Sequence, residues 1–160
     1  MIEELESLIG DPAKGLPEDI FLFISRITPL VNVDLLIKDE QNRTMLTWRD
    51  EAYSPPGWHV PGGIIRFKET FADRIHAVAQ KELGTGVTFS PAPLAFNQVI
   101  HPSRKDRGHF ISLLFDCRLM GHPSAARECH GKPRSGDWAW HDRCPDSLIP
   151  VHEMYRSYMN

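Results

Sequence analysis

The segment from Thr70 to Gly84 constrains the fold most, because it predicts a single helix with both ends defined. Thr70 followed by Asp73 fits the capping-box pattern, and Gly84 is a typical residue at a helix C-terminus. At about 100° per residue, four positions share one narrow stripe of this helix: Phe71, Ile75, Val78 and Glu82. The sequence therefore predicts a helix that packs on a core and carries an acidic residue on its packing side.

A carboxylate at Glu82 requires a compensating group. Burial removes its hydration, and the C-terminal end of the helix dipole is negative, so two effects act against the charge. A bound cation is the simplest partner, and an arginine is the alternative. Residues 58–63, Trp-His-Val-Pro-Gly-Gly, predict a short strand that runs into a glycine turn with exposed carbonyl oxygens. Together these features indicate a site for a metal ion and phosphate.

Length, composition and charge limit the class of protein. The chain has 160 residues, 41% of them hydrophobic, which is enough for one globular domain and too few for two ordinary ones. A formal net charge of −3 argues against a dedicated nucleic-acid or acidic-lipid binder, because such surfaces are strongly basic. No apolar run approaches the roughly 20 residues of a membrane span. We therefore expect neither nucleic acid nor a membrane as partner.

The first residues and the cysteines indicate a compartment. Residues 1–6 are acidic and lack the basic region and apolar core of a secretory signal. The three cysteines, Cys117, Cys129 and Cys144, form no regular disulfide framework, which favours a reducing environment. We therefore expect a cytoplasmic protein.

The N-terminal third predicts two helices and a hairpin. Residues 1–10 and 17–24 favour short helices, and the second begins at a proline. Residues 31–37 are strand-like, and a polar turn leads into a second strand at 44–48. Residues 51–57 contain two prolines and a glycine and predict a loop.

The remaining segments complete an α/β pattern. After the capped helix the sequence predicts strands at 94–101, 110–119 and 138–140, loops at 103–108 and 120–136, and a closing helix at 151–158. Strands, a crossover helix, further strands and a final helix imply a mixed sheet with helices on both faces.

The helix and the glycines before it resemble a known signature. Gly63, five residues, Glu69, seven residues and then residues 82–84, Glu-Leu-Gly, are similar to the signature helix of Nudix hydrolases. The resemblance implies the Nudix α/β/α sandwich. On this basis residues 1–160 form a single Nudix domain, in which residues 1–27 are an N-terminal helical extension.

The signature is incomplete in this chain. Ala77 stands where the family has arginine, and Val78 and Lys81 stand where it has two further metal-binding acidic residues. Only the last acidic position, Glu82, is kept. Fewer anionic ligands mean a weaker metal site, so we expect one Mg²⁺ ion held largely through substrate phosphates.

One branch of the family, the GDP-mannose mannosyl hydrolases, also lacks part of this signature and keeps the last glutamate. Residues 28–37 and 45–49 are similar to the first two strands of that branch. The resemblance implies a homodimer that hydrolyses a nucleoside diphosphate sugar such as GDP-mannose. Water attacks the sugar carbon in this reaction and the nucleoside diphosphate leaves, so a general base is needed on the far face of the sugar.

The resemblance also implies the metal ligands. Glu82 would bind Mg²⁺ through its carboxylate and Gly63 through its backbone carbonyl, because Mg²⁺ favours oxygen ligands. The alternative for Glu82 is an arginine partner or a frayed helix end. Glu69 would orient the metal site, and its alternative is a solvated charge at the helix start.

Three residues are candidates for substrate contacts. By position Arg49 would stabilise the leaving diphosphate, because a guanidinium binds phosphate oxygens bidentately; the alternative is a surface arginine beside acidic neighbours. Asp34 matches a nucleotide- or sugar-contacting aspartate, or it belongs to the polar face of a strand. Arg66 lies close enough after the glycines to approach phosphate, although the branch carries its arginine where this chain has Ile64.

The general base is the least defined role. The branch places a Gln-His pair before its late aromatic strand, where this chain has Arg134 and Ser135. His130, in the nearby loop, is the candidate base, and the alternative is an exposed loop histidine. Further candidates flank the charged loop, His101 and His109.

Three functions therefore remain open. The first is Mg²⁺-dependent hydrolysis of a nucleoside diphosphate sugar to nucleoside diphosphate and sugar. The second is a pyrophosphohydrolase that attacks phosphorus. The third is a Nudix-fold protein that binds a nucleotide sugar without turning it over.

Overall fold

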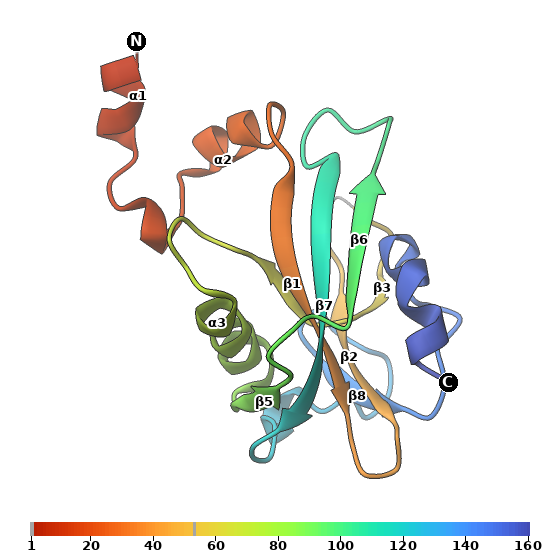
Figure 1. Cartoon of the computed structure of the whole chain (residues 1–160). Coiled ribbons are helices and arrows are strands. Elements are labelled where there is room, and N and C mark those ends of the chain that lie inside the picture. The colour runs from red at the N-terminus through yellow and green to blue at the C-terminus, as the bar shows by residue number, and fades with distance from the viewer. Residues whose placement is uncertain (1, 53) are drawn as a thin grey trace.

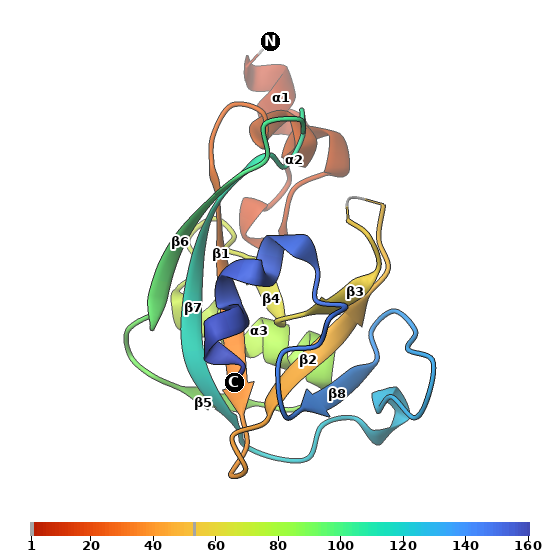
Figure 2. The ribbon, with the colours of Figure 1, turned by 90° about the vertical axis from the view of Figure 1, so that its right-hand side faces the viewer.

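The computed structural model describes residues 2–52 and 54–160 and shows a mixed sheet between helical layers. In Figures 1 and 2 helix α3 lies against one face of the sheet and the C-terminal helix η3 against the other. The described helices and 3₁₀ turns are α1 (Ile2–Leu8), η1 (Pro12–Lys14), α2 (Glu18–Ile24), α3 (Phe71–Leu83), η2 (Ala125–Arg127) and η3 (Pro150–Tyr158). The predicted α/β fold with helices on both faces is confirmed.

The sheet is centred on one long strand. Its strands are β1 (Leu30–Lys38), β2 (Thr44–Arg49), β3 (Gly57–His59), β4 (Gly62–Ile64), β5 (Val87–Phe89), β6 (Ala95–Ile100), β7 (His109–Leu119) and β8 (Trp138–His141). Strand β1 runs parallel to β7, with the register from Leu30↔Phe110 to Ile37↔Cys117. The order β3-β2-β1-β7-β5 forms the main path, while β4 pairs with β1, β6 with β7 and β8 with β2.

The other edge of β1 is shared by two strands. Strand β2 pairs with its C-terminal end at Ile37↔Met45, and β4 pairs with its middle at Val33↔Gly63. Strands β2 and β4 thus occupy different parts of one edge of β1. The chain enters β4 beside Asp34, which is paired with Gly62. This split edge positions the candidate site.

Side chains alternate between two cores, as a period of two requires. The core beneath α3 contains Leu35, Ile37, Met45 and Phe115 with the helix residues Ile75, Val78 and Leu83. The core beneath η3 contains Leu36, Leu46 and Leu114 with Tyr155 and Met159. Near-continuous apolar sequence in β1 therefore reflects a strand that is covered on both faces.

Helix α3 has the predicted ends. The Thr70 hydroxyl accepts a hydrogen bond from the Asp73 backbone N–H at 3.1 Å, and the Asp73 carboxylate accepts one from the Thr70 N–H at 3.0 Å. Gly84 ends the helix in the left-handed conformation with φ 73°. Ile75 and Val78 are buried as the stripe predicts, whereas Phe71 at the first turn is 45% exposed.

One local prediction was wrong. The glycine turn at 62–63 is instead the short strand β4, because Gly62 and Gly63 pair with the middle of β1. The predicted closing helix is present and is a 3₁₀ helix over its full length, Pro150–Tyr158. The hairpin of β1 with β2 and the strands β6, β7 and β8 agree with the sequence prediction.

The N-terminal segment lies against the loop between β6 and β7. Arg26 forms an ion pair with Asp106, and the Arg107 backbone N–H donates to the Ser25 hydroxyl at 3.0 Å. No helix within the described residues is both long and apolar enough to span a bilayer.

The capping box predicts the first stability effect. Thr70→Ala removes the acceptor of the Asp73 N–H, so the free energy of unfolding should fall by about 1 kcal/mol. Urea denaturation followed by circular dichroism measures the change. Thr70→Ser keeps a hydroxyl and should retain most of the wild-type value; an unchanged midpoint for Thr70→Ala would contradict the role of the cap.

Candidate functional site

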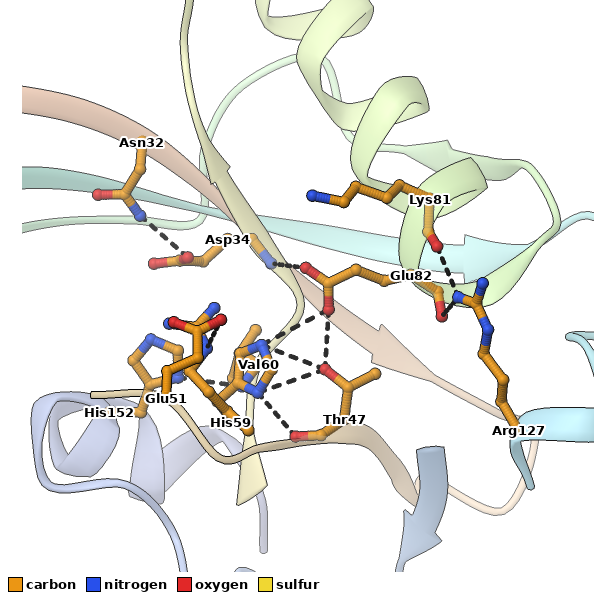
Figure 3. Close-up of polar contacts among 12 residues, drawn as sticks. Asn32, Asp34, Thr47, Glu51, His59, Val60, Lys81, Glu82, Arg127 and His152 are labelled. Atoms are coloured by element: carbon orange, nitrogen blue, oxygen red, sulfur yellow. Dashed lines mark hydrogen bonds and ion pairs between the residues drawn. The ribbon is translucent and has the colours of Figure 1, made fainter. Parts of the chain in front are cut away.

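Glu82 joins helix α3 to two strands of the sheet. Its carboxylate accepts hydrogen bonds from the Thr47 hydroxyl on β2 at 2.8 Å and from the Gly62 N–H on β4 at 3.3 Å. The Nε2 atom of His59, on β3, lies 3.5 Å from the same carboxylate. Figure 3 shows the Glu82 side chain reaching from the last turn of α3 toward these groups.

These contacts explain how an anion is tolerated there. Burial by itself raises the pKa of Glu82, but the hydrogen bond and charge of His59, the Thr47 hydroxyl and the charge of Arg49 together lower it below its usual value. Arg127 also donates to the backbone carbonyls of Lys81 and Glu82, at 2.6 and 3.1 Å, and so offsets the negative end of the helix.

The other two expected metal ligands lie in different surroundings. Glu69 accepts hydrogen bonds from the Arg74 guanidinium at 2.9 Å and from the Arg66 N–H at 2.8 Å. Burial opposes ionisation of Glu69, but Arg74 and Arg66 lower its pKa overall. A Cβ atom at Gly63 would lie 2.7 Å from a methyl group of Val78, so an apolar side chain packs beside this glycine.

The described side chains do not fit a preformed divalent-metal site. Among them no group of three or more His, Cys, Asp or Glu is arranged to hold an ion. Glu82 is already engaged with protein donors, and Lys81 places an ammonium group in the same turn. Mg²⁺ needs several oxygen ligands, and a neighbouring cation opposes its binding. The roles of Glu82, Gly63 and Glu69 as ligands stay predictions.

Cationic side chains gather around Glu82. A cavity beside it is lined by Arg49, Lys81 and Arg127 together with Glu51. Arg49 lies 3.8 Å from Glu51, a loose ion pair with both side chains partly accessible. This cavity therefore offers guanidinium and ammonium groups to an anionic ligand.

A second cavity, of about 190 Å³, is also lined by Gly62 and contains Asp34. Asp34 is 3% exposed, and its carboxylate accepts hydrogen bonds from the Tyr155 hydroxyl at 2.6 Å and from the Asn32 amide at 3.0 Å. Burial is the largest influence on the pKa of Asp34 and raises it to about 7, although Tyr155 and Asn32 act to lower it. Near neutral pH this carboxyl group therefore exists in both protonation states.

Arg49, Glu51 and Gly62 line both cavities, so the two form neighbouring parts of one site. Gly62 has to be a glycine because its surroundings leave no room for a side chain. A Cβ atom on it would lie 2.2 Å from the Asp34 carboxylate oxygen and 2.9 Å from the Val33 carbonyl oxygen.

The sequence did not reveal two residues of the Asp34 cluster, His152 and Tyr155. His152 Nδ1 accepts a hydrogen bond from the Val60 N–H at 3.0 Å, so its neutral ring carries the proton on Nε2. Burial, assisted by His59 and Arg49, lowers the pKa of His152 well below its usual value. The i, i+3 spacing of His152 and Tyr155 places both on one face of the 3₁₀ helix, which was a usable signal.

Of the remaining candidates, His101 lines the cavity of Asp34, whereas Arg66 and His130 lie elsewhere. Arg66 lines a third cavity, beneath the N-terminal segment, with Gly62, Gly63 and Glu82 but without Asp34 or Arg49. The His130 side chain is 76% exposed, and its Nε2 atom lies 3.7 Å from Glu128. His130 is not among the residues that line these three cavities. The structure therefore brings Asp34, Arg49 and Glu82 together and leaves His130 apart.

No family model matches the sequence. The chain is 32% identical over 111 residues to the low-salt glycan biosynthesis protein Agl8 of Haloferax volcanii, and the match covers 68% of this chain and 70% of that protein.

Solved structures share the fold. A MutT Nudix hydrolase from Burkholderia pseudomallei has a TM-score of 0.65 at 18% identity, over 83% of this chain and 99% of that one. A possible asymmetric diadenosine tetraphosphate hydrolase from Jonesia denitrificans has a TM-score of 0.64 at 19% identity, over 82% and 92%. The MutT protein from Methanosarcina mazei has a TM-score of 0.60 at 16% identity, over 82% and 91%. At these identities the likeness concerns the fold.

The close packing at Gly62 is testable. Gly62→Ala forces the new methyl group against Asp34 and Val33, so the free energy of unfolding should fall by at least about 1–3 kcal/mol. The control is Gly131→Ala, since a Cβ atom at Gly131 has nothing within 4 Å. Thermal unfolding compares the two variants, and equal melting temperatures would contradict the crowding at Gly62.

The pKa of Asp34 predicts a pH dependence of stability. Between its ordinary value of 3.8 and about 7, the folded protein holds a proton on Asp34 that the unfolded chain releases. The wild type should therefore lose stability relative to Asp34→Asn as pH rises through this interval, by at most about 1.4 kcal/mol per pH unit. Urea denaturation of both proteins at several pH values measures the difference. A wild-type stability that rises relative to that of Asp34→Asn over this pH interval would contradict the raised pKa.

Proposed function

Because the chain belongs to the family of the glycan biosynthesis protein Agl8 and has the Nudix hydrolase fold, we propose that it hydrolyses a nucleoside diphosphate sugar. GDP-mannose or a close relative is the favoured substrate. The observation that carries this proposal is the pair of adjoining cavities that share Arg49 and Gly62. One cavity presents cations, and the other presents a buried carboxyl group and a neutral histidine.

The two cavities suit the two parts of such a substrate. The diphosphate would bind beside Arg49, where a guanidinium can donate two parallel hydrogen bonds to phosphate oxygens. The sugar would occupy the cavity of Asp34 and His152. The His152 Nε2–H can then donate a hydrogen bond to a sugar hydroxyl group. The Asp34 carboxyl group can accept such a bond or, when protonated, donate one.

The reaction follows from this placement. A water oxygen forms a bond to the anomeric carbon while the bond from that carbon to the diphosphate oxygen breaks, and the leaving diphosphate keeps the electron pair. Arg49 stabilises the charge that develops on the leaving oxygen. The water must release a proton. Asp34, with a pKa near 7, is better suited to accept it than the exposed His130.

A binding protein without turnover is the second candidate. The observation that favours it is that Val78 and Lys81 replace acidic residues of the signature, and Glu82 is engaged by protein donors. One of the solved structures above is described as a possible diadenosine tetraphosphate hydrolase, so attack at phosphorus is a further outcome to be distinguished.

Product analysis separates these functions. Purified protein is incubated with GDP-mannose, in MgCl₂ and separately in EDTA, and the products are resolved by ion exchange. GDP and mannose are expected. GMP with mannose 1-phosphate would instead place the attack on phosphorus. Binding of GDP-mannose without products would favour the non-catalytic function, and neither binding nor products would reject the proposal.

Arg49 should matter through its guanidinium. Arg49→Lys keeps the charge but loses the bidentate geometry, so kcat/KM for GDP-mannose should fall roughly 100-fold. The matched control is Arg118→Lys, because Arg118 pairs with Asp116 on β7 and lines none of the three cavities. Steady-state kinetics measure both variants. Equal rates for Arg49→Lys and the control would exclude Arg49 from the reaction.

A further inference from the structure

Lys81 occupies an unusual position for a lysine in this fold. It precedes Glu82 in the last turn of α3, where the signature has a metal-binding acidic residue. The Lys81 and Glu82 side chains extend from the helix in the same direction in Figure 3. Lys81 lines both the cavity of Arg49 and Arg127 and the cavity of Arg66 and Arg74.

Lys81 is exposed, and the described residues give its ammonium group no counter-charge. Within residues 2–52 and 54–160 no hydrogen bond or ion pair involves its Nζ atom, although Glu82 is the adjacent residue. Glu82 is turned instead toward Thr47, Gly62 and His59. A lysine ammonium that lines a cavity and lacks a counter-charge can take an anionic ligand without first breaking an ion pair.

Two further cations line this cavity, Arg49 and Arg127, beside the carboxylates of Glu51 and Glu82. Arg127 uses one guanidinium nitrogen for the carbonyls of Lys81 and Glu82, which leaves its other nitrogens for a ligand. Arg49 is only loosely paired, at 3.8 Å from Glu51. Val78, at the other changed acidic position, puts a methyl group beside Gly63. Three cationic side chains thus face two carboxylates that already have protein partners, and this excess of positive charge suits a polyanion.

We propose that Lys81, with Arg49 and Arg127, binds the diphosphate directly, so that a nucleoside diphosphate binds this site without a divalent ion. The proposal rests on the proposed function, because it requires a diphosphate ligand in this cavity. The lysine charge takes the place that metal charge has in proteins with the complete signature, and Glu82 serves to hold α3 against β2 and β4.

Calorimetry with GDP as the probe tests this. Wild-type protein is titrated with GDP in EDTA and again in MgCl₂, and the dissociation constants should agree within about threefold. Lys81→Gln should weaken binding in EDTA by roughly 10-fold or more, because it removes a charge-assisted contact. Lys81→Glu restores the acidic residue of the signature; its GDP binding should be weakest in EDTA and should strengthen at least 10-fold when Mg²⁺ is added.

The matched control is Gln80→Glu. Gln80 is exposed in the same turn but lines none of the three cavities, so this variant adds a carboxylate near the helix end without placing it in the site. Its GDP affinity should equal that of the wild type in both buffers. Circular dichroism and melting temperature verify that each variant is folded.

The outcomes separate this inference from the proposed function. Wild-type GDP binding that disappears in EDTA would overturn the direct role of Lys81 and leave nucleotide-sugar hydrolysis standing. Unchanged affinity of folded Lys81→Gln would also overturn it. No binding of GDP or GDP-mannose in either buffer would instead reject the proposed function itself.

Discussion

The hydrogen bonds to the Glu82 carboxylate are the interaction on which the site depends. They connect the end of α3 to Thr47 on β2 and to Gly62 on β4, the two strands that divide one edge of β1. Without an acceptor at this point, the Gly62 backbone N–H would lose its partner, which costs about 1–3 kcal/mol for a buried group. The same carboxylate therefore ties α3 to the strands beside Gly62, the glycine that lines both cavities.

The sequence predicted those parts of the fold that have local signals. Thr70 with Asp73 and Gly84 defined α3, and apolar periodicity located β1, β6 and β7. Strand β4 was missed because three residues carry no readable period, and its pairing with β1 depends on residues nearly 30 positions away. A 3₁₀ helix at 150–158 has almost the same apolar spacing as an α-helix, so the sequence could not separate the two.

The candidate site was predicted in part. Glu82 was singled out by its place on the apolar stripe of its helix, and Asp34 and Arg49 were named from matched positions. The structure brings the three around Gly62. Tyr155 and His152 were missed because their partners are remote: Tyr155 contacts Asp34 across 121 positions of the chain, and His152 contacts Val60 across 92. Such pairings follow from how η3 packs over the sheet. The i, i+3 spacing of the two residues indicates a shared helix face but does not identify their partners.

The changes in the signature are consistent with one another. If the acidic residues had simply been lost, polar or charged side chains of any kind would serve at those positions. Instead Val78 is buried in the core beside Gly63, while Lys81 extends into the cavity that Arg49 and Arg127 already line. Val78 offers no ligand for a cation, and Lys81 adds positive charge where a diphosphate would lie. Under the proposed function, a site lined in this way would hold the diphosphate by direct contact with cationic side chains.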